Sequence, residues 1–311
     1  MDTPLVSVFL VTYNSSNYVL EALESVKDQT YPNIELIISD DASKDNTIEI
    51  CRNWIEKNKH HFKNTILITS EINTGVAPNC NRAIKASSGI WLKVLAGDDK
   101  LLPDTITNFI SYVTQTPKCD IVFGKLYFYG EDNLLVESVK NYYEETCYPL
   151  ILQNTVKKQF KSILKRMYVP GPGLFFKKDL WEEIGGYDEK YPMAEEYPFT
   201  FEVLKKNYYI YFLDKISYGY RVREDSICHD KHKITRTLRQ GQQHFLDKRL
   251  KEMLKNNMWL SAFDNYVKIK KDENKYKKRN NLIKFYLNFI YFLSPLLYKK
   301  NLQRLMKKIK A

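Results

Sequence analysis

Cysteine is sparse in this sequence. Only five cysteines occur among 311 residues, and no two of them form a CxxC pair. This odd, dispersed set argues against a disulfide framework and against a zinc site of paired cysteines, and it fits a reducing compartment. The N-terminus also lacks the basic lead of a signal peptide and carries Asp2. We therefore expect a cytoplasmic protein.

Two glycine-rich signatures of nucleotide binding are missing as well. The chain contains neither GxGxxG nor GxxxxGK[ST], which argues against a dinucleotide-binding fold and a P-loop. Long apolar runs are missing too. The run FYLNFIYFLSPLLY, residues 285–298, is interrupted by Asn288, Ser294 and Pro295, and it is too short to span a bilayer.

Acidic residues are absent after Glu273. Eleven lysines and arginines follow it, and the net charge of the whole chain is also +11. The residues up to Glu273 therefore carry equal numbers of positive and negative side chains. The positive charge therefore belongs to the C-terminal tail. Aromatic residues beside its basic clusters favour a segment that lies on anionic lipid. A helix packed on the preceding domain is the main alternative, and nucleic-acid binding is a weaker one.

The sequence is rich in alternating strand-like and helix-like segments. Over the first hundred residues, apolar β-rich runs are followed by segments with helical spacing. This alternation predicts an α/β fold with a doubly wound, mostly parallel sheet. The expected strands are Leu5–Val11, Ile34–Ser39, Thr65–Thr69, Ile90–Leu95, Asp120–Phe128 and Tyr208–Leu213, with helices at Val19–Thr30, Thr47–Glu56, Ala77–Ala86 and Lys178–Ile184.

The domain organisation follows from the charge and the periodicity. We expect a catalytic domain over residues 1–232 and a helical, basic C-terminal extension over residues 233–311. Residues 131–165 show no clear pattern.

Adjacent carboxylates follow two of the expected strands. Asp40 and Asp41 end one strand, and Asp98 and Asp99 follow another. Ligands bind at this edge of open α/β sheets. Hard oxygen ligands suit Mn²⁺ or Mg²⁺, which also accept phosphate oxygens, and a carboxylate can accept the imide N–H of uracil. We therefore expect a base near the first pair and metal-bound phosphates near the second, although a solvated Asp-Asp turn is the alternative at Asp98.

Three stretches carry a resemblance to a known family. They read VSVFLVTYNSSNYVLEALESVKDQTYPNIELIISDDASKDNT, NTGVAPNCNRAIKASSG and IWLKVLAGDDKLLPD, and they cover residues 5–110 almost continuously. They resemble the inverting glycosyltransferases of family two, which have the GT-A nucleotide-sugar fold. The resemblance implies nucleotide-sugar binding by Thr12, Tyr13, Asn14, Asp41, Asn81 and Asp98, with Asp99 as the direct metal ligand. Cys80 departs from the pattern, because many members have Arg there.

The same resemblance implies a catalytic base. After a Gly-Gly turn like that of the family, Glu196 stands where an acid opens a helix and acts as the base. Family members usually have Asp there, so Glu195 is a second candidate, and an acidic first helical turn favoured by the helix dipole is the non-catalytic alternative. Arg223 stands where many members have His, and either it or Arg221 is suited to contact the diphosphate.

Together these features imply inverting transfer from a UDP-sugar to an acceptor hydroxyl. The tail and the resemblance suggest a polyprenyl-diphosphate-linked saccharide in bacterial surface polysaccharide or O-antigen synthesis, with the enzyme peripheral on the inner face of the membrane. Two other functions stay open. One is a nucleotidyltransferase, and the other is a non-catalytic scaffold docked at the membrane.

Overall fold

The computed structural model describes residues 3–165, 171–191, 195–224, 245 and 248–266. The chain divides into two compact units, the first of residues 1–163 and 168–241 and the second of residues 164–167 and 242–311. The expected boundary at residue 232 lies outside the described residues, as does the basic tail.

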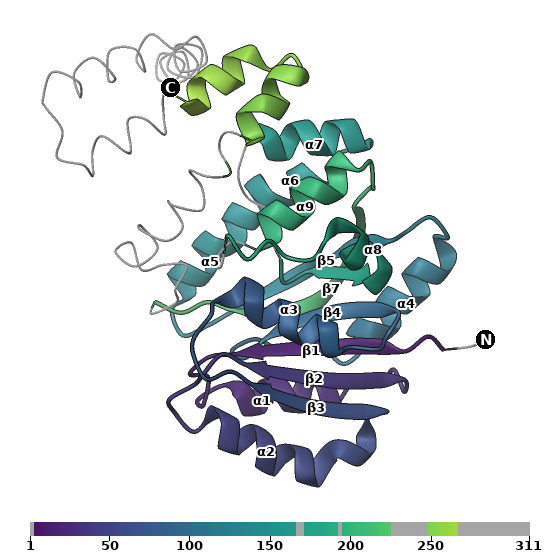
Figure 1. The fold of residues 1–311 in the computed structure, drawn as a ribbon, viewed down its shortest axis with the longest axis vertical. Helices are drawn as coiled ribbons and strands as arrows, with labels where there is room; N and C mark the ends of the chain where they lie inside the picture. Colours follow the sequence, from purple (N-terminus) through teal and green to yellow (C-terminus); the bar gives the residue numbers. More distant parts are fainter. Residues whose placement is uncertain (1–2, 166–170, 192–194, 225–244, 246–247, 267–311) are drawn as a thin grey trace, which may run out of the picture. The chain divides into compact units, whose positions relative to one another are not determined.

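The first unit is built on a seven-stranded sheet with the order β3-β2-β1-β4-β6-β5-β7 (Figure 1). Strand β6 is antiparallel to both of its neighbours, and the other pairings are parallel. This mostly parallel sheet confirms the α/β fold class. The strands are β1 (Val6–Thr12), β2 (Ile34–Asp40), β3 (Asn64–Thr69), β4 (Trp91–Ala96), β5 (Ile121–Tyr129), β6 (Leu174–Lys177) and β7 (Tyr211–Arg221).

Helices connect the parallel strands in the doubly wound manner. Helix α3 packs on β1 and β2, whereas α1 and α2 pack on one another (Figure 1). The order of β2, β1 and β4 means that the chain reverses direction across the sheet at β1. The helices are α1 (Val19–Lys27), α2 (Thr47–Asn58), α3 (Val76–Ala86), α4 (Thr105–Gln115), α5 (Asn133–Tyr142), α6 (Tyr148–Ile151), α7 (Val156–Lys165), α8 (Lys178–Ile184) and α9 (Glu196–Lys205).

The core explains why the central strands read as continuous apolar runs. Every residue of β2 and all but one of β1 are buried, as expected for parallel strands covered on both faces. Further along the sheet, the ring of Phe175 stacks on Trp91 and on Phe109, with centroid separations of 5.0 and 4.7 Å. These aromatic contacts fasten the short strand β6 to β4 and to helix α4.

Two segments differ from the sequence-based expectation. The pattern of residues 131–165 was unclear, and the structure shows α5, a π-helical turn (Tyr143–Cys147), α6 and α7 there. The strand expected at Tyr208–Leu213 begins at Tyr211 and continues to Arg221. Its register with β5 shifts near Lys125, and such irregularity hides the period-two pattern that sequence reasoning relies on.

Within the second unit the described residues form helices over 248–255 and 259–266. Asn257, with φ +57°, ends the first of them, and Arg249 Nε donates to the carbonyl oxygen of Leu164 at 2.7 Å. None of the helices among the described residues has the length and apolar character needed to cross a bilayer.

Candidate active site

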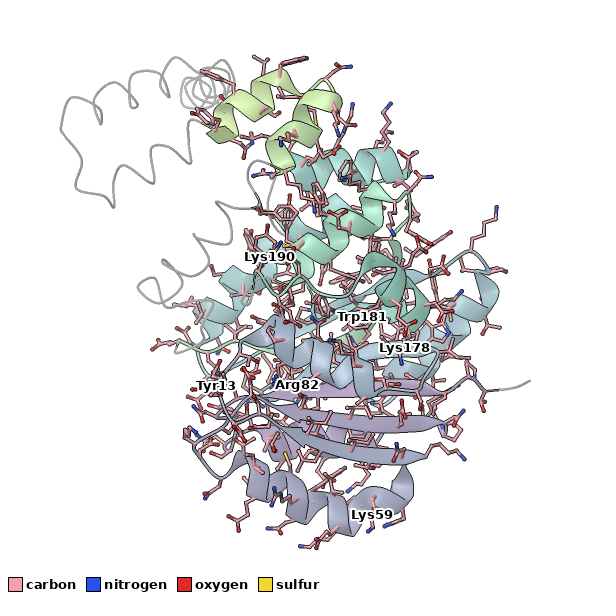
Figure 2. The ribbon with its side chains drawn as sticks, viewed as in Figure 1. Tyr13, Lys59, Arg82, Lys178, Trp181 and Lys190 are labelled. Carbon is pink, nitrogen blue, oxygen red and sulfur yellow. The ribbon has the colours of Figure 1, made fainter. Side chains whose placement is uncertain are left out.

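The site is organised by the end of β1. The carbonyl oxygen of Thr12 accepts a hydrogen bond from the Asp41 N–H at 3.0 Å, and that of Val11 accepts one from the Gly97 N–H at 2.9 Å. The loops after β2 and β4 therefore flank the end of β1 on either side, at the point where the chain direction reverses. Figure 2 shows Tyr13 at this edge, whereas Lys59 lies at the far end of α2. Ligands of open α/β sheets bind in such a crevice.

Asp41 is the most fully bonded carboxylate on the β2 side. Its Oδ1 accepts from Thr74 Oγ1 and from Arg82 Nη2, both at 2.7 Å, and its Oδ2 accepts from the backbone N–H groups of Thr74 and Gly75 at 2.8 and 2.7 Å. Four donors fill the acceptor capacity of one carboxylate. A ligand that donates to Asp41 must therefore displace one of them, and the side chain of Arg82 is 27% exposed.

The predicted base-lining turn is fixed by its neighbours. Thr12 is buried, and its hydroxyl donates to Asp40 Oδ2 at 2.7 Å. Asn14 has φ +49°, accepts from the Lys44 N–H through Oδ1 at 2.8 Å, and donates its own N–H to Ser43 Oγ at 2.8 Å. The ring of Tyr13 stays exposed between these fastened residues. It is therefore held where a planar group can stack on it.

Asn81 is buried on α3. Its amide donates to the carbonyl oxygen of Tyr187 at 2.9 Å and to Glu189 Oε1 at 2.8 Å, and its Oδ1 accepts from the Tyr187 N–H at 3.0 Å. Asn81 therefore fastens helix α3 to the turn that precedes α9.

The two carboxylates after β4 face different surroundings. Asp99 is buried, its Oδ2 accepts from the hydroxyl of Tyr218 at 2.8 Å, and its Oδ1 accepts from the Arg221 N–H at 2.7 Å. Burial, together with the charge of Asp98, raises the pKa of Asp99 well above its ordinary value. The Asp98 side chain is 31% exposed, and its Oδ2 lies 3.1 Å from Arg223 Nη2. Of the pair, Asp98 is the one that a ligand can reach.

Cationic side chains surround this second carboxylate pair. Arg221 Nε donates to the carbonyl oxygen of Asp98 at 2.8 Å, and its Nη2 pairs with Glu21. Lys100 pairs with Glu21 as well, at 2.8 Å. The guanidinium groups of Arg221 and Arg223 both lie over the ring of Tyr18, 4.8 and 4.7 Å from its centroid. Such a cluster favours a polyanionic ligand at the end of β4.

The residues fit a divalent cation of the phosphate-bound kind. Among the described residues, no three His, Cys, Asp or Glu side chains are grouped to hold an ion. Mg²⁺ and Mn²⁺ in phosphate sites need only one or two carboxylates, since phosphate oxygens and waters complete the shell. Asp98 already balances a cationic group at 3.1 Å, which shows that its carboxylate is placed to bind positive charge.

A second acidic pair opens α9. Glu195 is buried, and the two carboxyl groups of Glu195 and Glu196 share a hydrogen bond. Burial and the charge of Glu196 raise the pKa of Glu195 well above its ordinary value, and burial raises the pKa of Glu196 while the hydrogen bond from Glu195 opposes that rise. Two buried carboxyl groups that share a hydrogen bond hold one proton between them more readily than they carry two charges.

Helix α3 contacts Asp41 through Arg82 and the turn before α9 through Asn81, and Cys80 of the same helix is buried. Burial raises the pKa of its thiol well above the ordinary value, and the charges of Glu195, Glu196 and Asp41 raise it further. Through Arg82 and Asn81, helix α3 thus links Asp41 to the turn that precedes α9.

Several residues of this region were not predicted from the sequence. Arg82 contacts Asp41, Tyr218 contacts Asp99, and Glu21 joins two of the cations. Arg82 carries the only signal of the three, because it lies two residues after Cys80, where the family resemblance has its Arg.

Comparison with known proteins agrees with this geometry. Residues 7–184 match Glycosyl transferase family 2. An uncharacterized glycosyltransferase of Methanocaldococcus jannaschii is 27% identical over 228 residues, covering 71% of this chain and 72% of the relative. Glycosyltransferase GlyG of Streptococcus pneumoniae is 32% identical over 130 residues, covering 42% of this chain and 41% of GlyG. For GlyG, therefore, the match spans less than half of the relative.

Solved structures share the fold. S. aureus TarS 1-349 in complex with UDP-GlcNAc has a TM-score of 0.54 at 20% identity, with 85% of this chain and 81% of that chain covered. The mannosyltransferase PcManGT of Pyrobaculum calidifontis, in complex with GDP-Man and Mn²⁺, has a TM-score of 0.60 at 18% identity, with 82% and 65% covered. The expected GT-A fold is thereby confirmed. With a family match over more than half of its length, this chain belongs to glycosyl transferase family 2.

Proposed function

We propose that this glycosyltransferase moves a sugar from a UDP-sugar to an acceptor hydroxyl with inversion at the anomeric carbon. The observation that carries the proposal is the position of Asp41 and Asp98 on either side of the end of β1, with helix α3 contacting both Asp41 and the turn that precedes α9. The UDP-GlcNAc bound by the TarS structure supports a uridine donor.

The donor base binds beside Asp41. Its ring stacks on the exposed Tyr13, and its imide N–H donates to Asp41 as Arg82 gives up part of its contact with that carboxylate. Cytosine has no such N–H, so a uracil preference follows. The GDP-Man bound by PcManGT makes guanine the alternative base to test.

The donor diphosphate binds at the end of β4, where Asp98 would hold Mn²⁺ or Mg²⁺. The ion, when bound, stabilises the negative charge that develops on the departing diphosphate. The resemblance assigned the direct metal contact to Asp99, but the hydrogen bonds to Asp99 and the exposure of Asp98 favour Asp98. In this proposal Asp99 positions the end of β7 through the Arg221 N–H.

Glu196 acts as the general base. Its carboxylate removes the proton from the acceptor hydroxyl as the oxygen attacks the anomeric carbon from the face opposite the diphosphate. One displacement inverts the centre, and the proton ends on Glu196 while the bonding electrons leave with the diphosphate. Glu195 supports this role, since it shares a hydrogen bond with Glu196 and its own pKa is raised well above the ordinary value by burial and by the charge of Glu196.

The acceptor that we propose is a saccharide linked to polyprenyl diphosphate, used in surface polysaccharide or O-antigen synthesis. The support is the basic, aromatic tail, which suits an anionic membrane surface on the cytoplasmic side. Deletion of residues 282–311 should release the protein from anionic vesicles in a flotation assay. Retained binding would contradict this part of the proposal.

The donor assay tests the reaction itself. Hydrolysis and transfer should be measured for a panel of UDP- and GDP-sugars with Mn²⁺, for wild type, Asp98→Asn and Asp99→Asn. We expect turnover of a UDP-sugar that Asp98→Asn abolishes. The matched control is Asp214→Asn, whose carboxylate is 75% exposed and pairs only at the surface with Lys125. A non-catalytic scaffold would show no metal-dependent turnover in any variant. If Asp99→Asn lost more Mn²⁺ binding than Asp98→Asn, Asp99 would be the metal ligand instead.

A further inference from the structure

Arg223 and Asp98 form an ion pair across the ends of two strands. Arg223 Nη2 lies 3.1 Å from Asp98 Oδ2, and the two side chains are 25% and 31% exposed. Arg223 follows β7 and Asp98 follows β4, two strands that are not neighbours in the sheet. This contact therefore bridges the site where we place the diphosphate.

The two arginines of this region differ in what holds them. Arg221 is anchored to the backbone of Asp98 and to Glu21, and its guanidinium lies over the rings of Tyr18 and Tyr129. The ion pair of Arg223 is instead with the carboxylate that the proposed function assigns to the metal. Arg221 is thus held in place at the carboxyl end of the sheet, whereas the contact between Arg223 and Asp98 must change when a metal ion binds Asp98.

The change follows from charge. A guanidinium and a divalent cation on the same carboxylate repel each other, because like charges a few ångströms apart are only partly screened near a protein surface. A displaced guanidinium finds a better partner in a diphosphate, whose oxygens match its fork of N–H donors. The face of Tyr18, 4.7 Å from Arg223 Cζ, supports the guanidinium plane beside that position.

We propose that Arg223 and the metal ion exchange on Asp98 when the donor binds, an inference that rests on the proposed function. In the free protein Arg223 neutralises Asp98 and opposes metal binding. With the donor present, the metal binds Asp98 and Arg223 binds the donor diphosphate. Metal and nucleotide then bind cooperatively, and the protein has little affinity for the metal alone. The linkage is reciprocal, so the nucleotide also binds weakly without metal.

The test is direct measurement of Mn²⁺ and UDP binding, with no turnover needed. Free Mn²⁺ is followed by electron paramagnetic resonance, with and without UDP, and UDP binding is followed by calorimetry at saturating Mn²⁺. For wild type we expect UDP to tighten Mn²⁺ binding at least tenfold. In Arg223→Met, Mn²⁺ binding without UDP should tighten about fivefold, the worth of a partly exposed ion pair. UDP binding should weaken about tenfold or more, the worth of a charge-assisted hydrogen bond.

The opposite signs distinguish exchange from a structural role. A residue that only shapes the site would weaken both ligands when replaced, and that result, or no change in either, would overturn the exchange. Arg223→Lys keeps the positive charge but loses the planar pair of N–H donors. Mn²⁺ binding without UDP should therefore stay at the wild-type level, and UDP binding should weaken less than in Arg223→Met. Arg52→Met, on the exposed face of α2, controls for loss of a positive charge. Failure of wild type to bind UDP at all would contradict the proposed function, and with it the exchange.

Discussion

Gly171 lies directly against the carboxylate of Glu196. A Cβ on Gly171 would lie 2.1 Å from Oε1 and 2.2 Å from Cγ of Glu196, far inside van der Waals contact. Glycine at this position is therefore what leaves room for the side chain that we propose as the base. The residue belongs to a Gly-Pro-Gly segment, and its two glycines look from the sequence alone like an ordinary tight turn.

Replacing Gly171 with alanine should displace the base without emptying the donor site. We expect Gly171→Ala to lower kcat at least tenfold, since small misplacements of a reacting group are costly, while UDP affinity stays near wild type. Steady-state kinetics and UDP calorimetry check this. Glu196→Ala removes Cγ and the carboxylate and so relieves the clash, and Gly171→Ala/Glu196→Ala should therefore be no slower than Glu196→Ala alone. Additive losses would mean that Gly171 does not act through Glu196.

The acidic pair should show an asymmetric response to neutralisation. Glu196→Gln should reduce transfer by ~10²-fold or more, the usual worth of a general base, with UDP binding unchanged. Glu195→Gln keeps a hydrogen-bond donor and should retain most of the activity. Because burial raises the pKa of Glu196, the base form is lost as pH falls through that raised value, and the acid limb of kcat should lie above pH 4.5. If Glu195→Gln lost more transfer activity than Glu196→Gln, Glu195 would be the general base and Glu196 its supporting residue.

The positions of the acidic residues at the strand ends could be predicted from the sequence. Asp41 and Asp98 each follow a continuous apolar run, and parallel strands bring their ends to one edge. The structure confirms that both flank the end of β1. The local sequence pattern was enough to locate these two residues, because strand, turn and helix alternate with few interruptions over the first hundred residues.

The partners of these acids could not be predicted in the same way. Tyr218 contacts Asp99 across 119 residues, and Arg221 contacts Glu21 across 200. Both contacts depend on β7 joining the sheet beside β5 with an irregular register, which no local period reveals. The hydrogen bonds of Asn81 to the turn before α9 could not be predicted either, because they join residues 106 positions apart.

The hydrogen bonds around Asp41 predict a cost in stability as well as in binding. In Asp41→Asn, the amide group would face the N–H donors of Thr74 and Gly75 or the guanidinium of Arg82. We expect a loss of about 1–3 kcal/mol in the free energy of unfolding, the usual consequence of an unsatisfied buried donor, together with weaker UDP binding. Urea denaturation and UDP titration measure both. Asp214→Asn, at an exposed ion pair, should change neither. Undiminished UDP affinity would remove Asp41 from the base site.

Lys93 connects the core of the sheet to the segment that carries Gly171. Its side chain is fully buried in β4, and Nζ donates to the carbonyl oxygens of Pro172 and Leu174 at 2.5 and 3.2 Å. Nζ also lies 4.7 Å from the ring centroid of Tyr218. Burial lowers the pKa of Lys93 to about 7, so the folded protein releases this proton near neutral pH while the unfolded chain keeps it until near its ordinary value of 10.5.

The difference in pKa sets the sign of a stability measurement. Below about pH 7 both states carry the proton, and the full penalty of the buried charge is present. Between about pH 7 and 10 the unfolded chain binds one more proton than the folded one, so the contribution of Lys93 to stability rises with pH. The free energy of unfolding of Lys93→Met minus that of wild type should therefore fall by about 1.4 kcal/mol per pH unit over this range. Urea denaturation of both proteins at several pH values measures it. Lys57→Met, at an exposed position of α2, should give a difference that does not vary with pH. A flat difference for Lys93→Met would show that its ammonium stays charged in the fold.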